Sequence, residues 1–185
     1  MSDPEILFGI YCPPHPQPLL SPEASEGYGK LRDAFETCRK RIEESEADLI
    51  LVYSTTWPSI IGHQIQGHPE PEWVHVDDDF HYLGSMPYKF KMDTEFAEKF
   101  RESAESRGLQ SRTVAYDGFP IDTGSIVALK LLNPDNRIPA CIVSSNMYAN
   151  RAETIVLGKS ARDAIAAQGK NCLLYTSPSP RDRQE

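Results

Sequence analysis

The chain has 185 residues, 39% of them hydrophobic, which is enough for one folded domain with a core of its own. Nineteen lysines and arginines against 27 aspartates and glutamates give a net charge of −8, which argues against nucleic acid or an anionic membrane surface as the main partner. Four cysteines without a CxxC pair predict buried free thiols and a cytoplasmic location, and no apolar run is long enough to span a membrane.

Apolar runs alternate with amphipathic stretches along the chain. Residues 6–11 and 48–53 are predicted as strands buried on both faces, and the apolar residues between them recur every three or four positions, as in a helix. The pattern then predicts a long loop over 54–93, a helix capped by Thr94 and ending at Gly108, a strand over 112–116, a helix over 125–132, a strand over 138–144 and a helix over 152–168. This order predicts a layered α/β fold with a mostly parallel central sheet flanked by helices.

The last fourteen residues, 172–185, break with the amphipathic pattern before them and read CLLYTSPSPRDRQE. This stretch resembles the conceptual translation of a sequencing adapter, so we expect a natural part over residues 1–171 and a non-native tail over 172–185. The alternative is a natural strand over 172–175 followed by a Ser/Pro-rich tail. On the first interpretation the domain is truncated at its C-terminus.

Polar residues follow or precede the predicted elements at the edge where open α/β sheets bind ligands. His15 lies among prolines after the first strand, where it is either a metal ligand or proton carrier, or part of an ordinary surface turn. Thr56 and Trp57 follow the second strand; they can bind a polar atom and form a stacking wall, or they belong to a strand exit with a buried Trp. Asp122 and Thr123 precede a helix, as ligand-binding residues or as an N-cap.

The long loop is rich in side chains that bind metals. These are His63, His68, His75, His81, Asp77, Asp78 and Asp79. Their spacing, without a helix or a CxxC frame, is weak evidence for a metal site. The sequence contains no GxSxG, Walker, GxGxxG or HExxH motif, so nothing in it indicates a hydrolase, NTPase, Rossmann dehydrogenase or zincin.

Four segments, taken in order, resemble the class III extradiol ring-cleavage dioxygenases. They are residues 14–20 (PHPQPLL), 49–57 (LILVYSTTW), 120–124 (PIDTG) and 138–146 (IPACIVSSN). Within that family they resemble most the 2-aminophenol 1,6-dioxygenase group, particularly its non-catalytic α subunit. The resemblance implies an oxidoreductase that opens a catechol- or 2-aminophenol-type aromatic ring with O₂, at an Fe(II) held by two histidines and a glutamate.

By position, the resemblance makes His15 the first iron ligand and leaves two expected histidines missing. Thr56 stands at the position of the second iron histidine, and Thr123 replaces the histidine of the family's Asp-His-Gly signature. Because Fe(II) in this family is held by three protein ligands, the resemblance implies that this chain has no catalytic residues. We therefore expect a structural subunit that pairs with a homologous catalytic subunit in a hetero-oligomer, with the Fe(II) on that partner.

Two other functions stay open. The chain can be a catalytic dioxygenase subunit with a displaced second ligand, for which His63 is the nearest candidate, or a stand-alone binding or adaptor protein on the same fold. A catalytic subunit binds one Fe(II) and loses it on His15→Ala. A structural partner carries no iron and co-purifies with an iron-bearing homologue, and an adaptor does neither.

Overall fold

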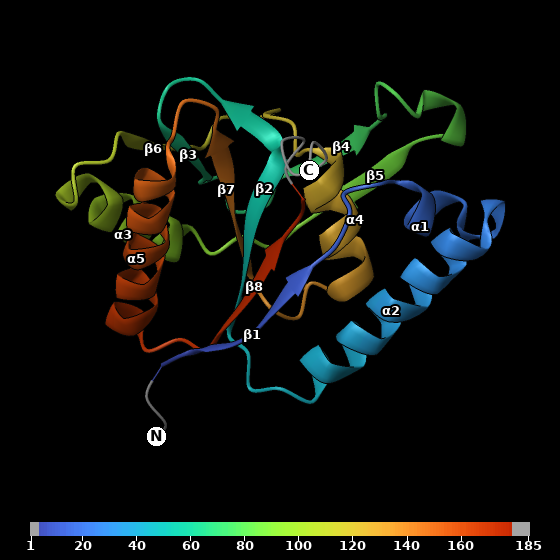
Figure 1. Cartoon of the computed structure of the whole chain (residues 1–185), viewed down its shortest axis with the longest axis horizontal. Helices are drawn as coiled ribbons and strands as arrows, with labels where there is room; N and C mark the ends of the chain where they lie inside the picture. Colours follow the sequence, from blue (N-terminus) through green and yellow to red (C-terminus); the bar gives the residue numbers. More distant parts are fainter. Residues whose placement is uncertain (1–3, 179–185) are drawn as a thin grey trace.

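The computed structural model describes residues 4–178, in which strands alternate with helices as the sequence pattern predicts (Figure 1). In chain order the elements are β1 (Ile6–Tyr11), α1 (Gln17–Leu20), the 3-10 helix η1 (Pro22–Ala24), α2 (Glu26–Glu43), β2 (Leu49–Ser59), β3 (His63–Gln66), β4 (Glu72–His75), the 3-10 helix η2 (His81–Leu83), β5 (Met86–Lys89), α3 (Thr94–Ser106), β6 (Ser111–Val114), α4 (Thr123–Leu132), β7 (Ala140–Asn146), α5 (Arg151–Gln168) and β8 (Cys172–Thr176).

A six-stranded sheet in the order β1-β8-β2-β7-β3-β6 forms the centre of the fold. β1, β8, β2 and β7 are mutually parallel, whereas β3 pairs antiparallel with β7 and parallel with β6. β4 and β5 form a separate antiparallel pair. The mostly parallel α/β sheet predicted from the sequence is confirmed, and its four parallel strands end at one common edge.

Helices cover both faces of the sheet (Figure 1). α2 packs with α4 on one face, and α3 packs with α5 on the other. Each face has its own core, the first around Phe35 and Ile126 and the second around Phe100 and Leu157. The strands β8, β2 and β7 contribute to both cores, because successive residues of a strand point to opposite faces of the sheet.

Polar side chains define where the last three helices begin. The Asp93 carboxylate accepts a hydrogen bond from the first turn of α3 at 3.0 Å, so the N-cap is Asp93 and not Thr94 as the pattern predicts. A carboxylate is the stronger cap, which explains the shift by one residue. Asp122 caps α4, and Asn150 opens α5 with a capping box.

The stretch 54–93, predicted as one long loop, contains the end of β2 and the strands β3, β4 and β5. Each of these three strands has only four residues and carries polar side chains. Such strands show neither an apolar run nor a long alternation, so the hydrophobic pattern does not reveal them.

β1 was predicted to be buried on both faces, and the structure places it at the edge of the sheet. Its first and last residues, Ile6 and Tyr11, are exposed. An apolar run predicts a strand, but it does not tell how many neighbours that strand has.

Residues 172–176, which the sequence assigns to a non-native tail, form strand β8 inside the sheet. β8 pairs in parallel with β1 on one side and with β2 on the other, and Cys172, Leu173 and Tyr175 are buried. This is the conformation of the alternative interpretation, a strand over 172–175. The boundary between a natural part and an adapter-derived tail stays a prediction. Residues 179–185 of that tail lie outside the described part of the chain.

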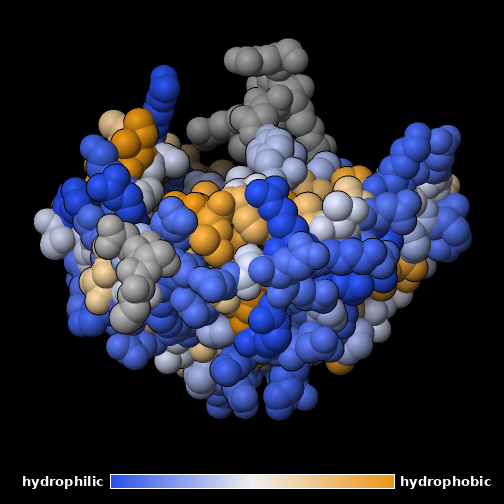
Figure 2. Space-filling view, turned by 90° about the horizontal axis from the view of Figure 1, so that it is seen from below, coloured by the Kyte–Doolittle hydropathy of each residue, from blue (hydrophilic) through white to orange (hydrophobic). Residues whose placement is uncertain are grey.

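The face at the amino ends of the parallel strands is mostly hydrophilic, with a few hydrophobic residues near its middle (Figure 2). Within residues 4–178, none of the helices combines the length and apolar character needed to cross a membrane. The polar residues singled out from the sequence lie at the opposite edge, where the parallel strands end.

Candidate functional site

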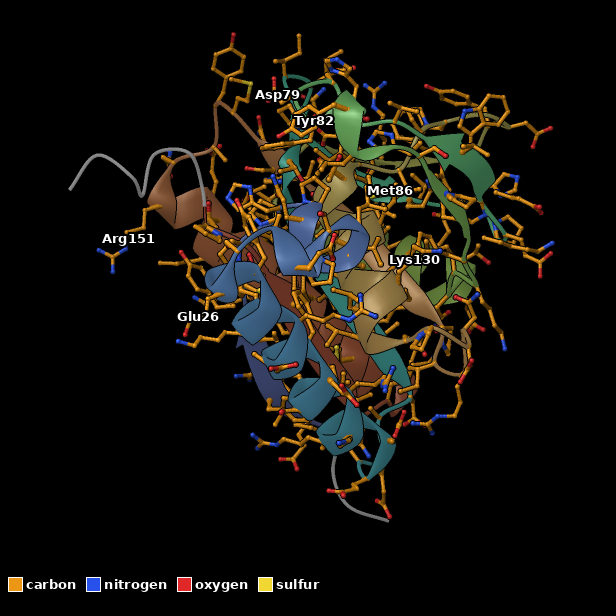
Figure 3. All side chains as sticks on the ribbon, turned by 90° about the vertical axis from the view of Figure 1, so that its right-hand side faces the viewer. Glu26, Asp79, Tyr82, Met86, Lys130 and Arg151 are labelled. Atoms are coloured by element: carbon orange, nitrogen blue, oxygen red, sulfur yellow. The ribbon has the colours of Figure 1, made fainter. Side chains whose placement is uncertain are left out.

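A cavity of about 400 Å³ lies where the ends of β1 and β2 meet the beginning of α4. It is lined by Pro14, His15, Thr56, His75, Asp77, Asp78, Asp79, Phe80, Asp122 and Thr123. Four of the five site residues predicted from the sequence therefore come together. Of the other lining residues, Pro14 precedes His15, His75 ends β4, and the rest belong to the connection between β4 and β5, which Asp79 and Tyr82 mark above α1 and α4 in Figure 3.

His15 lies in the connection between β1 and α1, where prolines restrict the backbone. Pro16 is the N-cap of α1, and Pro18 lies in its first turn. The imidazole meets the ring of Phe80 edge to face, with ring centroids 6.1 Å apart. His15 is thus positioned by its own rigid segment and by an aromatic ring from the β4–β5 connection.

The Asp122 carboxylate gathers hydrogen bonds from β2 and from α4. Oδ1 accepts from Ser54 Oγ at 2.9 Å, Thr56 Oγ1 at 2.5 Å and the Ser125 N–H at 3.0 Å. Oδ2 accepts from Ser125 Oγ at 2.7 Å. A carboxylate offers about four acceptor sites, so these donors occupy most of its capacity. Asp122 therefore ties two elements together and has little left for a metal ion or a proton.

Thr56 reaches Asp122 because β2 leaves its regular pairing with β7 at this point. The pairing jumps from Ser54 opposite Ser144 to Pro58 opposite Ser145, so the three residues between are extra in β2. Such a bulge bends a strand and redirects its side chains. The bulge brings the threonine hydroxyl to the amino end of α4.

The Thr123 hydroxyl joins two side chains that come from β4 and the residues after it. It donates to Asp77 Oδ2, and it accepts from His75 Nε2 at 2.9 Å. The direction of these bonds assigns a proton to Nε2 of His75. The three side chains connect the β4–β5 hairpin to the amino end of α4 across the cavity.

Gly124 sets how closely the cavity walls approach each other. A Cβ at this position would lie 2.6 Å from Thr56 Oγ1 and 2.8 Å from Pro14 Cβ. Both distances are far shorter than van der Waals contact. Only glycine lets α4 begin this close to β2 and to the β1–α1 connection.

The side chains of the cavity do not fit a ferrous ion. Among residues 4–178, no three histidine, cysteine, aspartate or glutamate side chains are placed to hold one metal ion. The His75 Nε2–H is directed to Thr123, the Asp122 oxygens accept several hydrogen bonds, and threonine hydroxyls do not replace imidazoles as iron ligands. The two threonines instead use their hydroxyls to hold the cavity together.

The cavity offers polar binding groups and no activated thiol. Burial raises the pKa of Cys12, close to His15 in the chain, to about 12, so this thiol stays protonated at neutral pH. The lining hydroxyls, imidazoles and carboxylates can bind a polar small molecule.

Two residues considered from the sequence lie outside the cavity. Trp57 packs against Phe119, with ring centroids 5.3 Å apart, and does not line the cavity. His63, the candidate for a displaced second ligand, begins β3 and is buried there. Burial lowers the pKa of its imidazole, and its Nδ1 makes no hydrogen bond to the described residues.

The other histidines of the 54–93 stretch do not gather into the loop metal site drawn from the sequence. His68 Nε2 lies 3.0 Å from Asp117 Oδ1, and His81 Nδ1 lies 3.3 Å from the Asp78 carbonyl. His75 binds Thr123. Each imidazole has a different partner, because short strands and turns separate them in space.

The sequence did not predict that His75, Asp77 and Phe80 meet His15 in one cavity. The pairing of β4 with β5 brings them there, and it leaves no local pattern in the sequence. One signal was present: His75 and Asp77 are two positions apart, which puts both side chains on one side of an extended chain.

Comparison with known proteins agrees with the resemblance seen in the sequence. Residues 9–177 match the family described as the catalytic LigB subunit of aromatic ring-opening dioxygenase. The alpha subunit of 2-aminophenol 1,6-dioxygenase from a Pseudomonas species is 30% identical over 89% of this chain and 61% of its own length. The beta subunit is 31% identical over 96% of this chain and 63% of its own length.

The chain thus spans about three-fifths of the length of these two curated relatives, 61% and 63%. A 3,4-dihydroxyphenylacetate 2,3-dioxygenase from Escherichia coli is 22% identical over 61% of this chain and 41% of its own. The crystal structure of the uncharacterized protein JW3007 from Escherichia coli K12 matches with a TM-score of 0.54 and 18% identity, over 77% of this chain and 51% of that one. The last match supports the fold.

Proposed function

We propose a function from the premise that this chain belongs to the LigB family of aromatic ring-opening dioxygenase subunits. The proposed function is that of a non-catalytic subunit, which pairs with a homologous catalytic subunit acting on a catechol- or 2-aminophenol-type compound with O₂. Both the alpha and the beta subunit of one dioxygenase are homologues of this chain, which supports a hetero-oligomer. Because the identity to each is nearly equal, the choice between the two roles depends on the site.

The observation that carries the proposal is that the hydroxyls of Thr56 and Thr123 form hydrogen bonds in the cavity. Both stand where the family resemblance calls for histidine, and both hydroxyls donate to carboxylates, those of Asp122 and Asp77. His15 keeps the expected residue type at the position of the first iron ligand. A site with these replacements does not provide three points for Fe(II), so the proposal places the iron in the partner subunit.

Anaerobic reconstitution with Fe(II), followed by desalting and iron quantification, tests the first half of the proposal. We expect this chain to retain far less than one iron per chain, and His15→Ala to retain the same small amount. A stoichiometric iron that is lost in His15→Ala would overturn the proposal and identify a catalytic subunit.

Co-expression tests the second half. A tagged copy of this chain should retain a homologue that carries histidine at the positions of Thr56 and Thr123, and the complex should contain iron and open the aromatic ring. A chain that binds neither iron nor such a homologue would be a stand-alone binding or adaptor protein, contrary to the proposal.

A further inference from the structure

A second cavity, of about 270 Å³, lies between the segment that leads into β4 and the turn that follows β6. It shares no lining residue with the cavity around His15. Its walls combine three aromatic rings with three carboxylates, those of Trp73, Tyr116, Phe119, Glu70, Glu72 and Asp117. Neither lysine nor arginine is among its lining residues.

The aromatic rings form a supported wall. Tyr116 meets Phe119 edge to face with centroids 5.2 Å apart, and Trp57 packs against the same Phe119. Trp73 and Tyr116 are 62% and 63% exposed, so these large rings are accessible to a ligand. Trp57, which the sequence suggested as a stacking wall for the first cavity, thus supports the wall of the second.

The backbone holds both sides of this cavity in place. On one side, Gly118 adopts a left-handed φ of +76° and closes a turn in which the Phe119 N–H donates to the Tyr116 carbonyl at 3.4 Å. On the other side, the Phe90 N–H donates to the Pro71 carbonyl at 3.1 Å. The cavity therefore does not depend on a ligand to bring its walls together.

Two of the three carboxylates, Glu70 and Asp117, form no ion pair with lysine or arginine among residues 4–178. Glu72 binds Lys89 Nζ at 2.9 Å, whereas Asp117 accepts from His68 Nε2 at 3.0 Å. The Glu70 N–H donates to His68 Nδ1 at 3.2 Å. Lys89, which is paired with Glu72, also attracts the Glu70 carboxylate, but no lysine or arginine among residues 4–178 is in direct contact with Glu70 or Asp117.

We propose that this cavity binds an organic cation, an ammonium, quaternary ammonium or guanidinium group. The faces of aromatic rings attract positive charge, and the Glu70 and Asp117 carboxylates complement it. A volume of about 270 Å³ accommodates a group of the size of choline. The cation is either a free small molecule or a basic side chain of a partner protein, and both offer the same chemistry.

Tryptophan fluorescence measures occupancy, because of the two tryptophans of the chain Trp73 lines the cavity and Trp57 packs against Phe119 in its wall. Titration with choline at constant ionic strength should change the emission in a saturable way, with a dissociation constant of about 1 to 10 mM. The neutral isostere 3,3-dimethylbutanol should have no such effect. An equal response to the isostere, or no saturable response to choline, would overturn the proposal.

Substitutions at exposed positions test the wall without threatening the fold. Tyr116→Leu should weaken choline binding about two- to fivefold, whereas Tyr116→Phe, which keeps the ring, should not. Tyr148→Leu is the matched control, since Tyr148 is 78% exposed and does not line this cavity. Equal choline affinities for Tyr116→Leu and Tyr148→Leu would contradict a role of the ring.

The source of the cation follows from a comparison of ligands. Tighter binding of choline than of N-acetyl-arginine amide points to a free quaternary ammonium compound, and the reverse order points to a basic side chain of a partner. Binding of neither would overturn the proposal. Since the titration needs neither iron nor a second subunit, its outcome is independent of the proposed dioxygenase role.

Discussion

Two helical glycines differ in the space around them, and this difference predicts opposite effects of adding one methyl group. At Gly124 in α4 the new Cβ would meet Thr56 Oγ1 at 2.6 Å and Pro14 Cβ at 2.8 Å, whereas at Gly158 in α5 it would meet nothing within 4 Å. We expect Gly124→Ala to lower the free energy of unfolding by about 1 to 3 kcal/mol, through overpacking of a close contact. Gly158→Ala should raise it by about 0.5 to 1 kcal/mol.

Urea denaturation of both variants and of the unsubstituted chain measures these changes. A Gly124→Ala variant as stable as Gly158→Ala would show that the amino end of α4 can move away from β2.

Asp122 caps α4 and also accepts hydrogen bonds from Ser54 and Thr56, so its removal has two consequences. Loss of an N-cap costs about 1 kcal/mol, and hydroxyls left without an acceptor cost about 1 to 3 kcal/mol. We therefore expect Asp122→Ala to lower the free energy of unfolding by about 2 to 4 kcal/mol. Thermal and urea unfolding measure it.

Asn150→Ala is the control, because Asn150 caps α5 and has no such hydroxyl partners from another element. It should cost only about 1 kcal/mol. If both substitutions cost the same, the contacts from β2 contribute nothing beyond the cap.

Among the elements, helices were easier to predict than strands. The positions of α2 and α5 follow from amphipathic patterns, which are local properties of the chain. β3, β4 and β5 are short and polar, and they are strands only because of the strands that pair with them. The sequence pattern shows no sign of that pairing.

β8 is the strand that connects β1 to the rest of the central sheet. It joins β1 to β2, and Leu173 and Tyr175 belong to the core under α2 and α4. We expect a chain that ends at residue 171 to lose cooperative unfolding. Removing β8 leaves β1 without its partner strand and exposes both cores.

Circular dichroism during a thermal scan compares this shortened chain with the chain of 185 residues. A shortened chain that melts cooperatively, with near-ultraviolet signals like those of the longer one, would show that β8 is dispensable.

At the scale of the whole molecule, one buried histidine links stability to pH. Burial lowers the pKa of His63 below its ordinary value of about 6.5, so the unfolded chain takes up a proton at a pH where the folded chain does not. The contribution of His63 to stability is therefore complete above about pH 6.5 and decreases as the pH falls toward the lowered value.

His63→Gln removes this group, so its free energy of unfolding should fall less between about pH 7.5 and 5.5 than that of the unsubstituted chain. The difference should not exceed about 1.4 kcal/mol, because a proton taken up with an unfolded pKa of about 6.5 contributes at most about 1.4 kcal/mol per pH unit below that value. Urea unfolding at the two pH values measures it. Identical decreases in both proteins would contradict a buried, neutral His63.

The sequence by itself determined the alternation of strands and helices and the family, whereas the assignment of Thr56 and Thr123 to positions of expected histidines stays a prediction. These conclusions depend on residue identity and on local periodicity, which can be read along the chain. The tertiary structure decided that Asp122 connects β2 to α4, that His75 and Asp77 bind Thr123, and that Trp57 packs behind Phe119 in the wall of a second cavity. Each of these contacts joins segments far apart in the chain, and the order of strands that brings them together is a property of the folded sheet, not of any local pattern.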